Sequence, residues 1–318
     1  MKTVAKPIYL LTLLTLFAAS GAVCPGYQPP IYVAPPQVLS PQPTLPQLIE
    51  VVNANSAKIQ SLSSNQATVS VAGLPALSAN LAVGSPRRIR LTAGTGLSGE
   101  EIDLGSNDEL FWLWVKRNQP PNIYFCRHNE FERSAARQII PVRPEWVASA
   151  LGMVRLDPSA PHELRIAANR NLEIYSTWQD GQQTFRRVTV LEPNAGWVVE
   201  QHMYAADGTL VASAFNSQHV PDPATGAVLP RTTRVKWPRT GMEFTLTLRD
   251  LQVNPAGLNE QLFQMPSIDG YQHVNLGVPG ASPLGIPANH PQTNYAPPTQ
   301  WPVQPVGGYY PTNSAGAS

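Results

Sequence analysis

Few stretches of this chain combine residue types and spacing that chemistry could use. Gly94-Thr95-Gly96-Leu97-Ser98-Gly99 matches the GxGxxG pattern of dinucleotide-binding loops. That pattern needs a helix N-terminus behind it to receive a pyrophosphate, whereas Glu100–Leu104 alternates like a strand. We therefore interpret the glycine-rich stretch as a flexible hairpin loop and not as a nucleotide site.

Histidine and cysteine spacing predicts no metal centre. None of the six histidines lies in an HExxH motif or at another close zinc spacing, and two cysteines, Cys24 and Cys126, cannot build a cysteine-rich zinc site. Cys126, in an apolar run, is expected to be a buried free thiol. Ser217, His219 and Asp222 are close in sequence but fall in an expected proline-bounded loop, and there is no GxSxG elbow. The sequence predicts no enzyme, no metal and no cofactor.

Charged side chains gather between residues 87 and 108 without forming a recognisable site. The acids are Glu101, Asp103 and Asp108. Paired carboxylates can hydrolyse glycosides, but these three fit solvated strand and turn positions. The basic patch is Arg87, Arg88 and Arg90. We interpret the patch either as a solvated outer face or as a contact for lipid headgroups.

The first 22 residues have the organisation of an export signal. Lys2 and Lys6 form a positive start, Ile8–Ala19 is apolar, and small residues lead to a cleavage site after Ala22. The apolar stretch is too short to span a bilayer core of about 30 Å as a helix. We therefore predict an exported protein, located in the periplasm or at the outer membrane.

Cys24 follows this signal at a position that resembles the lipobox of bacterial lipoproteins. The resemblance implies lipidation of Cys24 and an N-terminal lipid anchor at a membrane surface. Val23 and Gly21 depart from the motif, which usually has a small residue just before the cysteine and Leu three residues before it. Ordinary cleavage after Ala22 and a soluble product therefore remain the alternative.

Proline divides the rest of the chain into three parts. The 33 prolines cluster towards both ends. Residues 23–43 are predicted to be a stiff proline-rich tether, 44–277 a folded β domain, and the uncharged 278–318 a disordered tail. The formal net charge of +1 shows no excess of basic residues, so a nucleic-acid partner is not expected.

Two helices and many strands are expected in the domain. Apolar residues at helical spacing predict a helix from Leu45 to Leu62 with Thr44 as N-cap, and Pro144 and Gly152 bound a short helix midway. The expected strands are Ala67–Val71, Leu77–Val83, Arg87–Ala93, Glu101–Leu104, Leu110–Val115, Asn122–Arg127, Glu163–Ala167, Leu172–Thr177, Thr184–Leu191, Trp197–Tyr204, Leu210–Phe215, Leu229–Val235 and Glu243–Val253.

These strands follow one another too closely for helical crossovers, so antiparallel pairing is expected. Leu110–Val115 is apolar on both faces and should be covered on both sides. The predicted fold is therefore mainly β: an incomplete antiparallel β-barrel, or curved sheet, capped by the N-terminal helix and the short mid-chain helix.

The order of these elements resembles the LolA/LolB-like superfamily of lipoprotein carriers and outer-membrane lipoprotein-sorting proteins. The local strings that carry the resemblance are Ile59–Leu62, Pro86–Leu91, Asp103–Asn107, Phe111–Trp114, Pro144–Gly152 and Phe263–Pro266. It covers residues 45 to 274. In that family, helices close an incomplete barrel whose concave side holds acyl chains.

The resemblance implies a non-enzymatic cell-envelope protein that binds lipid acyl chains or a lipidated partner in an apolar cavity, with a role in lipoprotein sorting. The residues expected to line such a cavity are Leu81, Ile89, Leu91, Phe111, Leu113, Trp146 and Leu151. The alternative is a structural or interaction protein of the envelope, with a filled barrel and a partner-binding tail.

Overall fold

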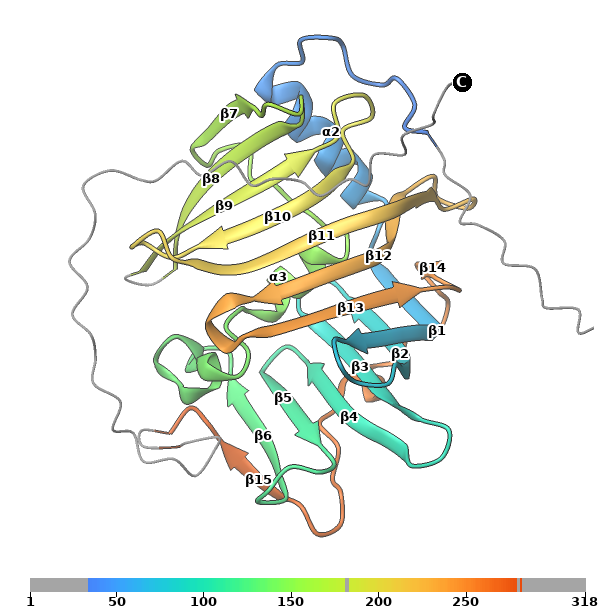
Figure 1. The fold of residues 1–318 in the computed structure, drawn as a ribbon, viewed down its shortest axis with the longest axis vertical. Coiled ribbons are helices and arrows are strands. Elements are labelled where there is room, and N and C mark those ends of the chain that lie inside the picture. The colour runs from blue at the N-terminus through green and yellow to red at the C-terminus, as the bar shows by residue number, and fades with distance from the viewer. Residues whose placement is uncertain (1–33, 181–182, 279–280, 282–318) are drawn as a thin grey trace, which may run out of the picture. The chain divides into compact units, whose positions relative to one another are not determined.

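The computed structural model describes residues 34–180, 183–278 and 281 (Figure 1). The predicted signal, the lipidation site Cys24 and most of the predicted tail lie outside these residues. Ala34–Pro43, the described part of the predicted tether, contacts the domain: Leu39 is buried, and the backbone N–H groups of Val38 and Leu39 donate to the Asn194 carbonyl at 2.9 and 2.7 Å. The predicted division at residues 22, 43 and 277 stays a prediction.

All strands of the described residues belong to one sheet. They are β1 (Ser61–Val71), β2 (Leu77–Gly84), β3 (Arg88–Thr95), β4 (Gly99–Ser106), β5 (Leu110–Val115), β6 (Asn122–Arg127), β7 (His162–Ile166), β8 (Leu172–Asp180), β9 (Gln183–Leu191), β10 (Val198–Tyr204), β11 (Leu210–Pro221), β12 (Val228–Trp237), β13 (Met242–Leu248), β14 (Gln252–Val253) and β15 (Gln272–Asn275). The sheet runs in the order β15-β6-β5-β4-β3-β2-β1-β13-β12-β11-β10-β9-β8-β7, and β14 pairs with β1 beside this path.

The sheet curves but does not close, as Figure 1 shows. Within the described residues, β7 and β15 each pair with a neighbour on one side only. Pairing is antiparallel throughout except between β15 and β6, which are parallel. Together with helices α2 (Leu45–Ala57) and α3 (Pro144–Ala150), this arrangement confirms the predicted incomplete antiparallel barrel with two helices.

Helix α2 begins as predicted and ends earlier. The backbone N–H of Thr44 donates to the Gln47 side chain at 2.8 Å, which fixes the N-terminus. The helix stops at Ala57. Ile59 and Leu62, expected on its apolar face, are fully buried in the link to β1 and in β1 itself. Apolar residues three positions apart fit one face of a helix, and they also fit a buried link that leads into a strand. The pattern alone therefore did not predict where α2 ends.

The strands mostly lie where alternation and turn residues predicted them, but β1 already begins at Ser61, and three differences occur at the C-terminal side. The expected strand Glu243–Val253 is two strands, β13 and β14, and β14 pairs with β1. β15 was not expected, because its four residues carry little apolar pattern. β11 continues to Pro221, so Ser217 and His219 lie on a strand and not in a loop. Ser217 and His219 pair with Thr232 and Pro230 of β12. The β11–β12 pairing thus continues beyond the apolar stretch Leu210–Phe215 that predicted the strand.

β5 is covered on both sides, as its sequence predicted. Phe111 packs into a cluster that includes residues of α3, whereas Trp112 and Trp114 lie in a separate cluster. That cluster is completed by Met265, Ile268 and Tyr271 of the segment before β15. Cys126 on the neighbouring strand is a buried free thiol, as expected.

Candidate functional site

An apolar cavity lies between α3 and the concave side of the sheet. Two arms of the sheet form its wall, one from β2–β5 and the other from β12 and β13. The residues of the wall are Leu81, Ile89, Leu91, Leu104, Gly105, Ser106, Phe111, Ile140, Pro144, Val147, Ala150, Leu151, Thr233, Val235, Trp237, Phe244 and Leu246. The cavity volume is about 60 Å³. A dry cavity of about 150 Å³ holds benzene, so this one has no room for an acyl chain as it stands.

Cross-strand register explains why side chains from distant positions share this wall. Leu81 of β2 is directly opposite Leu91 of β3, and Leu91 is opposite Leu104 of β4. Directly opposed residues in an antiparallel sheet point to the same face. The row continues to Leu113 of β5, which packs nearby against the cluster of Phe111 but does not border the cavity.

Five of the seven residues expected to line a cavity border this one. They are Leu81, Ile89, Leu91, Phe111 and Leu151. Leu113 lies beside it, and Trp146 borders a neighbouring pocket on the other side of α3. Whether any of them binds a ligand stays a prediction. Sequence reasoning did not include the second arm, although Val235, Phe244 and Leu246 alternate inward as clearly as Ile89 and Leu91 do.

Helix α3 covers the cavity with one face. Pro144 occupies the first turn, where its missing N–H is no loss. Pro144, Val147 and Leu151 recur at helical spacing and face the cavity. Gly152 ends the helix with φ +103°, and a Cβ there would lie 2.8 Å from Leu229 Cδ2. Position 152 therefore requires glycine for both its backbone angle and its contact with β12.

Two polar attachments hold α3 against the sheet. Glu145 Oε1 lies 3.1 Å from Arg87 Nε in the β2–β3 turn, with both side chains about one-third exposed. At the other end, Ser149 Oγ donates to Gln201 Oε1 and Gln201 Nε2 donates to the Ser149 carbonyl, each at 2.8 Å. Gln201 is fully buried, so this reciprocal pair satisfies an amide that would otherwise lack partners.

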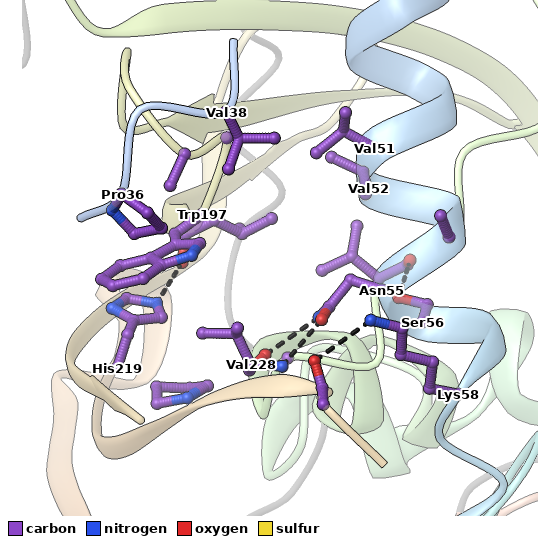
Figure 2. Close-up of a pocket in the computed structure, with 18 residues that line it drawn as sticks. Pro36, Val38, Val51, Val52, Asn55, Ser56, Lys58, Trp197, His219 and Val228 are labelled. Atoms are coloured by element: carbon purple, nitrogen blue, oxygen red, sulfur yellow. Dashed lines mark hydrogen bonds between the residues drawn. The ribbon is translucent and has the colours of Figure 1, made fainter. Parts of the chain in front are cut away.

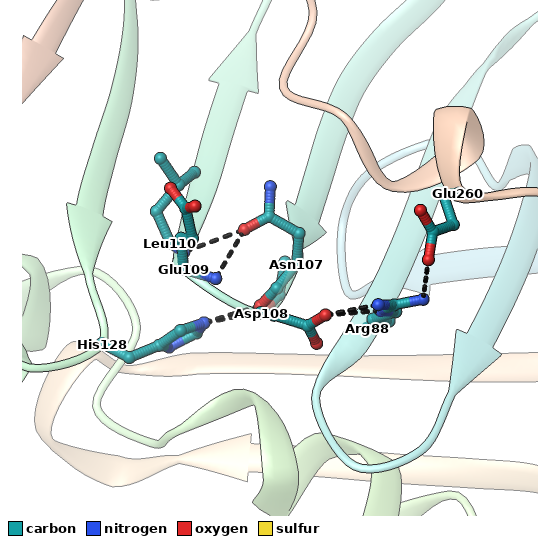
Figure 3. A network of polar contacts seen from close by, with 8 residues as sticks. Arg88, Asn107, Asp108, Glu109, Leu110, His128 and Glu260 are labelled. Carbon is teal, nitrogen blue, oxygen red and sulfur yellow. Dashed lines mark hydrogen bonds and ion pairs between the residues drawn. The ribbon is translucent and has the colours of Figure 1, made fainter.

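The three arginines predicted to form a basic patch are all paired with acids, so the patch does not exist as an open lipid-headgroup surface. Arg87 pairs with Glu145, Arg88 with Asp108 and Glu260, and Arg90 with Asp103. Figure 3 shows Arg88 between Asp108 and Glu260. In the same network His128 Nε2 lies 2.8 Å from the Asn107 carbonyl. This network ties the β4–β5 turn to the C-terminal segment.

Asp103 is buried, which corrects the expectation of a solvated carboxylate. Trp112 Nε1 donates to its Oδ1 at 3.1 Å and Arg90 Nη2 donates to its Oδ2 at 2.7 Å. Arg90 also reaches the carbonyl of Leu262 at 3.0 Å. The C-terminal segment covers this face of the sheet, and local sequence carries no sign of that cover. The Asp103 carboxylate therefore has a structural role and is not accessible to a substrate.

A second hollow of about 300 Å³ lies between α2 and the ends of β10–β12 (Figure 2). The Trp197 and His219 rings stack there at 5.3 Å, and Lys58 Nζ donates to the Gly226 carbonyl at 3.1 Å. His219 Nε2 lies 3.0 Å from the Val198 carbonyl, and burial lowers the pKa of His219. Asn55 bonds the Val228 backbone on the opposite wall.

This hollow does not assemble a hydrolytic site from Ser217, His219 and Asp222. Asp222 accepts hydrogen bonds from the Thr225 backbone and hydroxyl, both at 2.8 Å, and takes no part in a bond to His219. The polar groups that face the hollow are largely satisfied by backbone partners. The apolar cavity under α3 is therefore the stronger candidate site.

Neither a metal site nor a membrane-spanning helix occurs in the ranges described above. Their His, Cys, Asp and Glu side chains form no group of three or more that could hold a metal ion. No helix within the same ranges has both the length and the apolar character that crossing a bilayer demands.

Several solved structures resemble this fold at low sequence identity. A DUF1329 family protein from Desulfovibrio piger is 14% identical with a TM-score of 0.43, and an outer membrane lipoprotein-sorting domain from Vibrio parahaemolyticus is 11% identical with a TM-score of 0.45. A LolA superfamily protein from Nitrosomonas europaea is 10% identical with a TM-score of 0.40. Each comparison covers 68% of this chain and 95%, 95% and 97% of the respective structure.

No family model and no curated protein matches the sequence. Two of the three structures carry names from the superfamily that the sequence resembles. With TM-scores below 0.5, the likeness concerns the fold and supports no conclusion about ligand or role.

Proposed function

We propose that this is a non-enzymatic envelope protein that binds a lipid acyl chain, free or attached to a lipidated partner, between α3 and the curved sheet. The observation that carries the proposal is the apolar cavity, whose wall joins two arms of the sheet under a single short helix. Concave, largely apolar hollows with a few polar groups at the rim are the usual form of a small-molecule site.

Binding requires α3 to move, because the cavity is smaller than any acyl chain. The helix has only seven residues. Displacing it breaks one partly exposed ion pair and the Ser149–Gln201 bonds, and it uncovers the apolar face of Pro144, Val147 and Leu151. An acyl chain of twelve carbons contributes about 0.8 kcal/mol per buried CH₂, roughly 10 kcal/mol in total. That gain is of the same order as the apolar burial and hydrogen bonds that α3 gives up.

The test is lipid uptake by the full mature chain, measured by native mass spectrometry and by titration with a fluorescent fatty acid. Ala150→Leu adds volume at the cavity wall and is expected to weaken binding at least fivefold. Ala148→Leu is the matched control, because Ala148 is a buried alanine of the same helix that does not border the cavity. Equal affinity in both variants and wild type would contradict the proposed site.

The runner-up function is a structural or interaction protein with a filled barrel. One observation favours it: side chains fill most of the space under α3 and leave about 60 Å³. The same titration separates the two functions. If no lipid co-purifies and the fatty acid is not taken up, the structural or interaction function is supported. In that case residues 278–318 are the proposed partner-binding part.

Export to the periplasm or outer membrane, with Cys24 as anchor, completes the proposal. Intact-mass measurement of the mature N-terminus tests it. A diacylglyceryl adduct on Cys24 is the expected result for an anchored protein, whereas an unmodified start at Val23 would show a soluble product and refute the anchor.

A further inference from the structure

A third hollow, here called the aromatic pocket, lies on the far side of α3 from the apolar cavity. Its volume is about 310 Å³, and the residues that define its character are Phe131, Trp146, Trp178, Phe185, Met203 and Arg187. Glu145 and Trp146 of α3 face this pocket, whereas Pro144, Val147, Ala150 and Leu151 face the cavity. At 100° per residue Glu145 lies opposite the cavity-facing residues, whereas Trp146 lies at the boundary, next to Ala150, so the two groups adjoin on the helix surface. Displacing α3 therefore joins the two hollows.

Arg187 brings an unpaired positive charge to the aromatic pocket. Its Nη2 donates to the Arg155 carbonyl at 2.9 Å, but its buried Nε has no acceptor among the described residues. No carboxylate of those residues forms an ion pair with it, and burial lowers the pKa of Arg187 to about 10. Arg187 as a whole is half-buried, and an anion that entered the pocket would meet both its positive charge and its open Nε donor.

Trp146 adds a second open donor at the same place. Its indole Nε1 is buried and has no acceptor among the described residues. The stacked rings of Trp178 and Phe185, 5.6 Å apart, form a flat apolar wall beside it. A charged donor, a neutral donor and an aromatic wall suit the junction between an anionic headgroup and an alkyl chain.

The other charges of the pocket leave this arrangement positive. Glu132 also borders it and lies 3.3 Å from Arg137 and 3.1 Å from Arg143. Glu145 pairs with Arg87, outside the pocket. Each carboxylate thus has a guanidinium partner, although Glu132 Oε2 and Glu145 Oε2 are buried without a hydrogen bond. With Arg137 and Arg143 also in the lining, the pocket holds three arginines against two glutamates, and no carboxylate of the described residues pairs with Arg187.

We propose that the ligand of this protein is an anionic amphiphile with one acyl chain, and that its phosphate or carboxylate group accepts hydrogen bonds from Arg187 Nε and Trp146 Nε1. The chain extends from the aromatic pocket beneath the displaced α3 into the apolar cavity. This inference rests on the proposed acyl-chain function and specifies the headgroup.

The experiment compares dodecyl phosphate, 1-dodecanol and inorganic phosphate by isothermal titration of the full mature chain. Wild type is expected to bind dodecyl phosphate at least tenfold more tightly than 1-dodecanol, and inorganic phosphate only weakly. Arg187→Gln is expected to abolish that preference, because it should weaken the binding of dodecyl phosphate far more than the binding of 1-dodecanol. Arg165→Gln is the control, because Arg165 is an arginine on β7 that pairs with Glu163 away from the pocket.

Trp146→Phe provides a second variant that keeps the ring and removes the donor. It is expected to reduce the preference about threefold, and thermal melts establish that each variant folds. Equal wild-type affinity for dodecyl phosphate and 1-dodecanol would overturn the headgroup assignment and leave the acyl-chain function standing. Binding of neither amphiphile would overturn both. Tight binding of inorganic phosphate alone, lost in Arg187→Gln, would show a free-anion site and refute the amphiphile.

Discussion

Arg87 of the β2–β3 turn and Glu145 in the first turn of α3 form an ion pair, with Nε and Oε1 3.1 Å apart. The pair connects the first arm of the sheet to the helix that covers the apolar cavity. Because both side chains are about one-third exposed, solvent and salt weaken the attraction. The attachment is therefore a weak one, as the proposed displacement of α3 requires.

Arg87→Ala is expected to loosen α3 without destabilising the whole domain. Exposed ion pairs contribute about 0–1 kcal/mol, so amides of residues 146–151 should exchange about two- to fivefold faster, with a loss of global stability below about 1 kcal/mol. Hydrogen–deuterium exchange measures the first quantity and urea denaturation the second. Arg165→Ala, which removes the pair with Glu163 on β7, should leave exchange in α3 unchanged.

Ser149→Ala is expected to cost about 1–3 kcal/mol in the free energy of unfolding. The change removes the donor to Gln201 Oε1 and leaves part of a fully buried amide without a partner. Urea denaturation followed by far-UV circular dichroism gives the value. Ser70→Ala, at an exposed position of β1, should change stability by less than about 0.5 kcal/mol. A similar small effect at Ser149 would mean that α3 is not held there.

Asp103→Ala is expected to be far more damaging than Asp108→Ala, although both carboxylates pair with arginine. Asp103 is buried, and its loss leaves Arg90 without its ion-pair partner and Trp112 Nε1 without an acceptor, at a cost of about 3 kcal/mol. The Asp108 side chain is 54% exposed, so its removal should cost less than about 1 kcal/mol. Equal losses in thermal or urea denaturation would disprove the distinction.

Stability is expected to fall as the pH drops below about 6.5, in part through His219. Burial lowers the pKa of His219 in the folded protein, so in this range the unfolded chain binds more protons than the folded one. Each pH unit between the two pKa values costs up to about 1.4 kcal/mol. His128, whose pKa burial also lowers, adds to the slope.

His219→Phe keeps a ring against Trp197 and removes the titration. Urea denaturation at pH 7.0 and 5.5 should show a smaller loss of stability in this variant than in wild type. His273→Gln, at an exposed position, should retain the full wild-type loss. If wild type and His219→Phe lose the same stability between pH 7.0 and 5.5, His219 does not contribute to the pH dependence of stability.

Local patterns were enough to predict most elements of the fold. Alternation and turn residues located nearly all strands, and Pro144 with Gly152 bounded α3, because these signals act within a few residues. The same alternation placed Leu81, Ile89 and Leu91 on the concave side. The predictions that failed concerned residues whose surroundings come from distant segments of the chain. Asp103 looked solvated because nothing near it in sequence shows that residues 262–276 cover it.

The site was predicted less completely than the fold. Sequence reasoning named residues from one arm of the sheet and from α3, and missed Val235, Phe244 and Leu246 of the other arm. Arg187 was missed as well, because its open Nε reflects the absence of a nearby carboxylate in space. The adjacent Arg186 and Arg187 of β9 give no sign in the sequence of which arginine lacks a carboxylate partner.

The pairing of β1 with β13 joins segments from opposite ends of the domain, with Ala67 opposite Leu248 and Val71 opposite Phe244. On either side of this seam β1–β6 and β7–β13 follow chain order, so these two runs of strands can form from neighbouring hairpins, whereas β14 and β15 join β1 and β6 from the C-terminal end. Until β13 arrives, β1 has an open edge that invites pairing with other chains. Synthesis thus proceeds with an incomplete sheet, and two fragments made by cutting the exposed 157–159 stretch should reassemble along the β1–β13 seam.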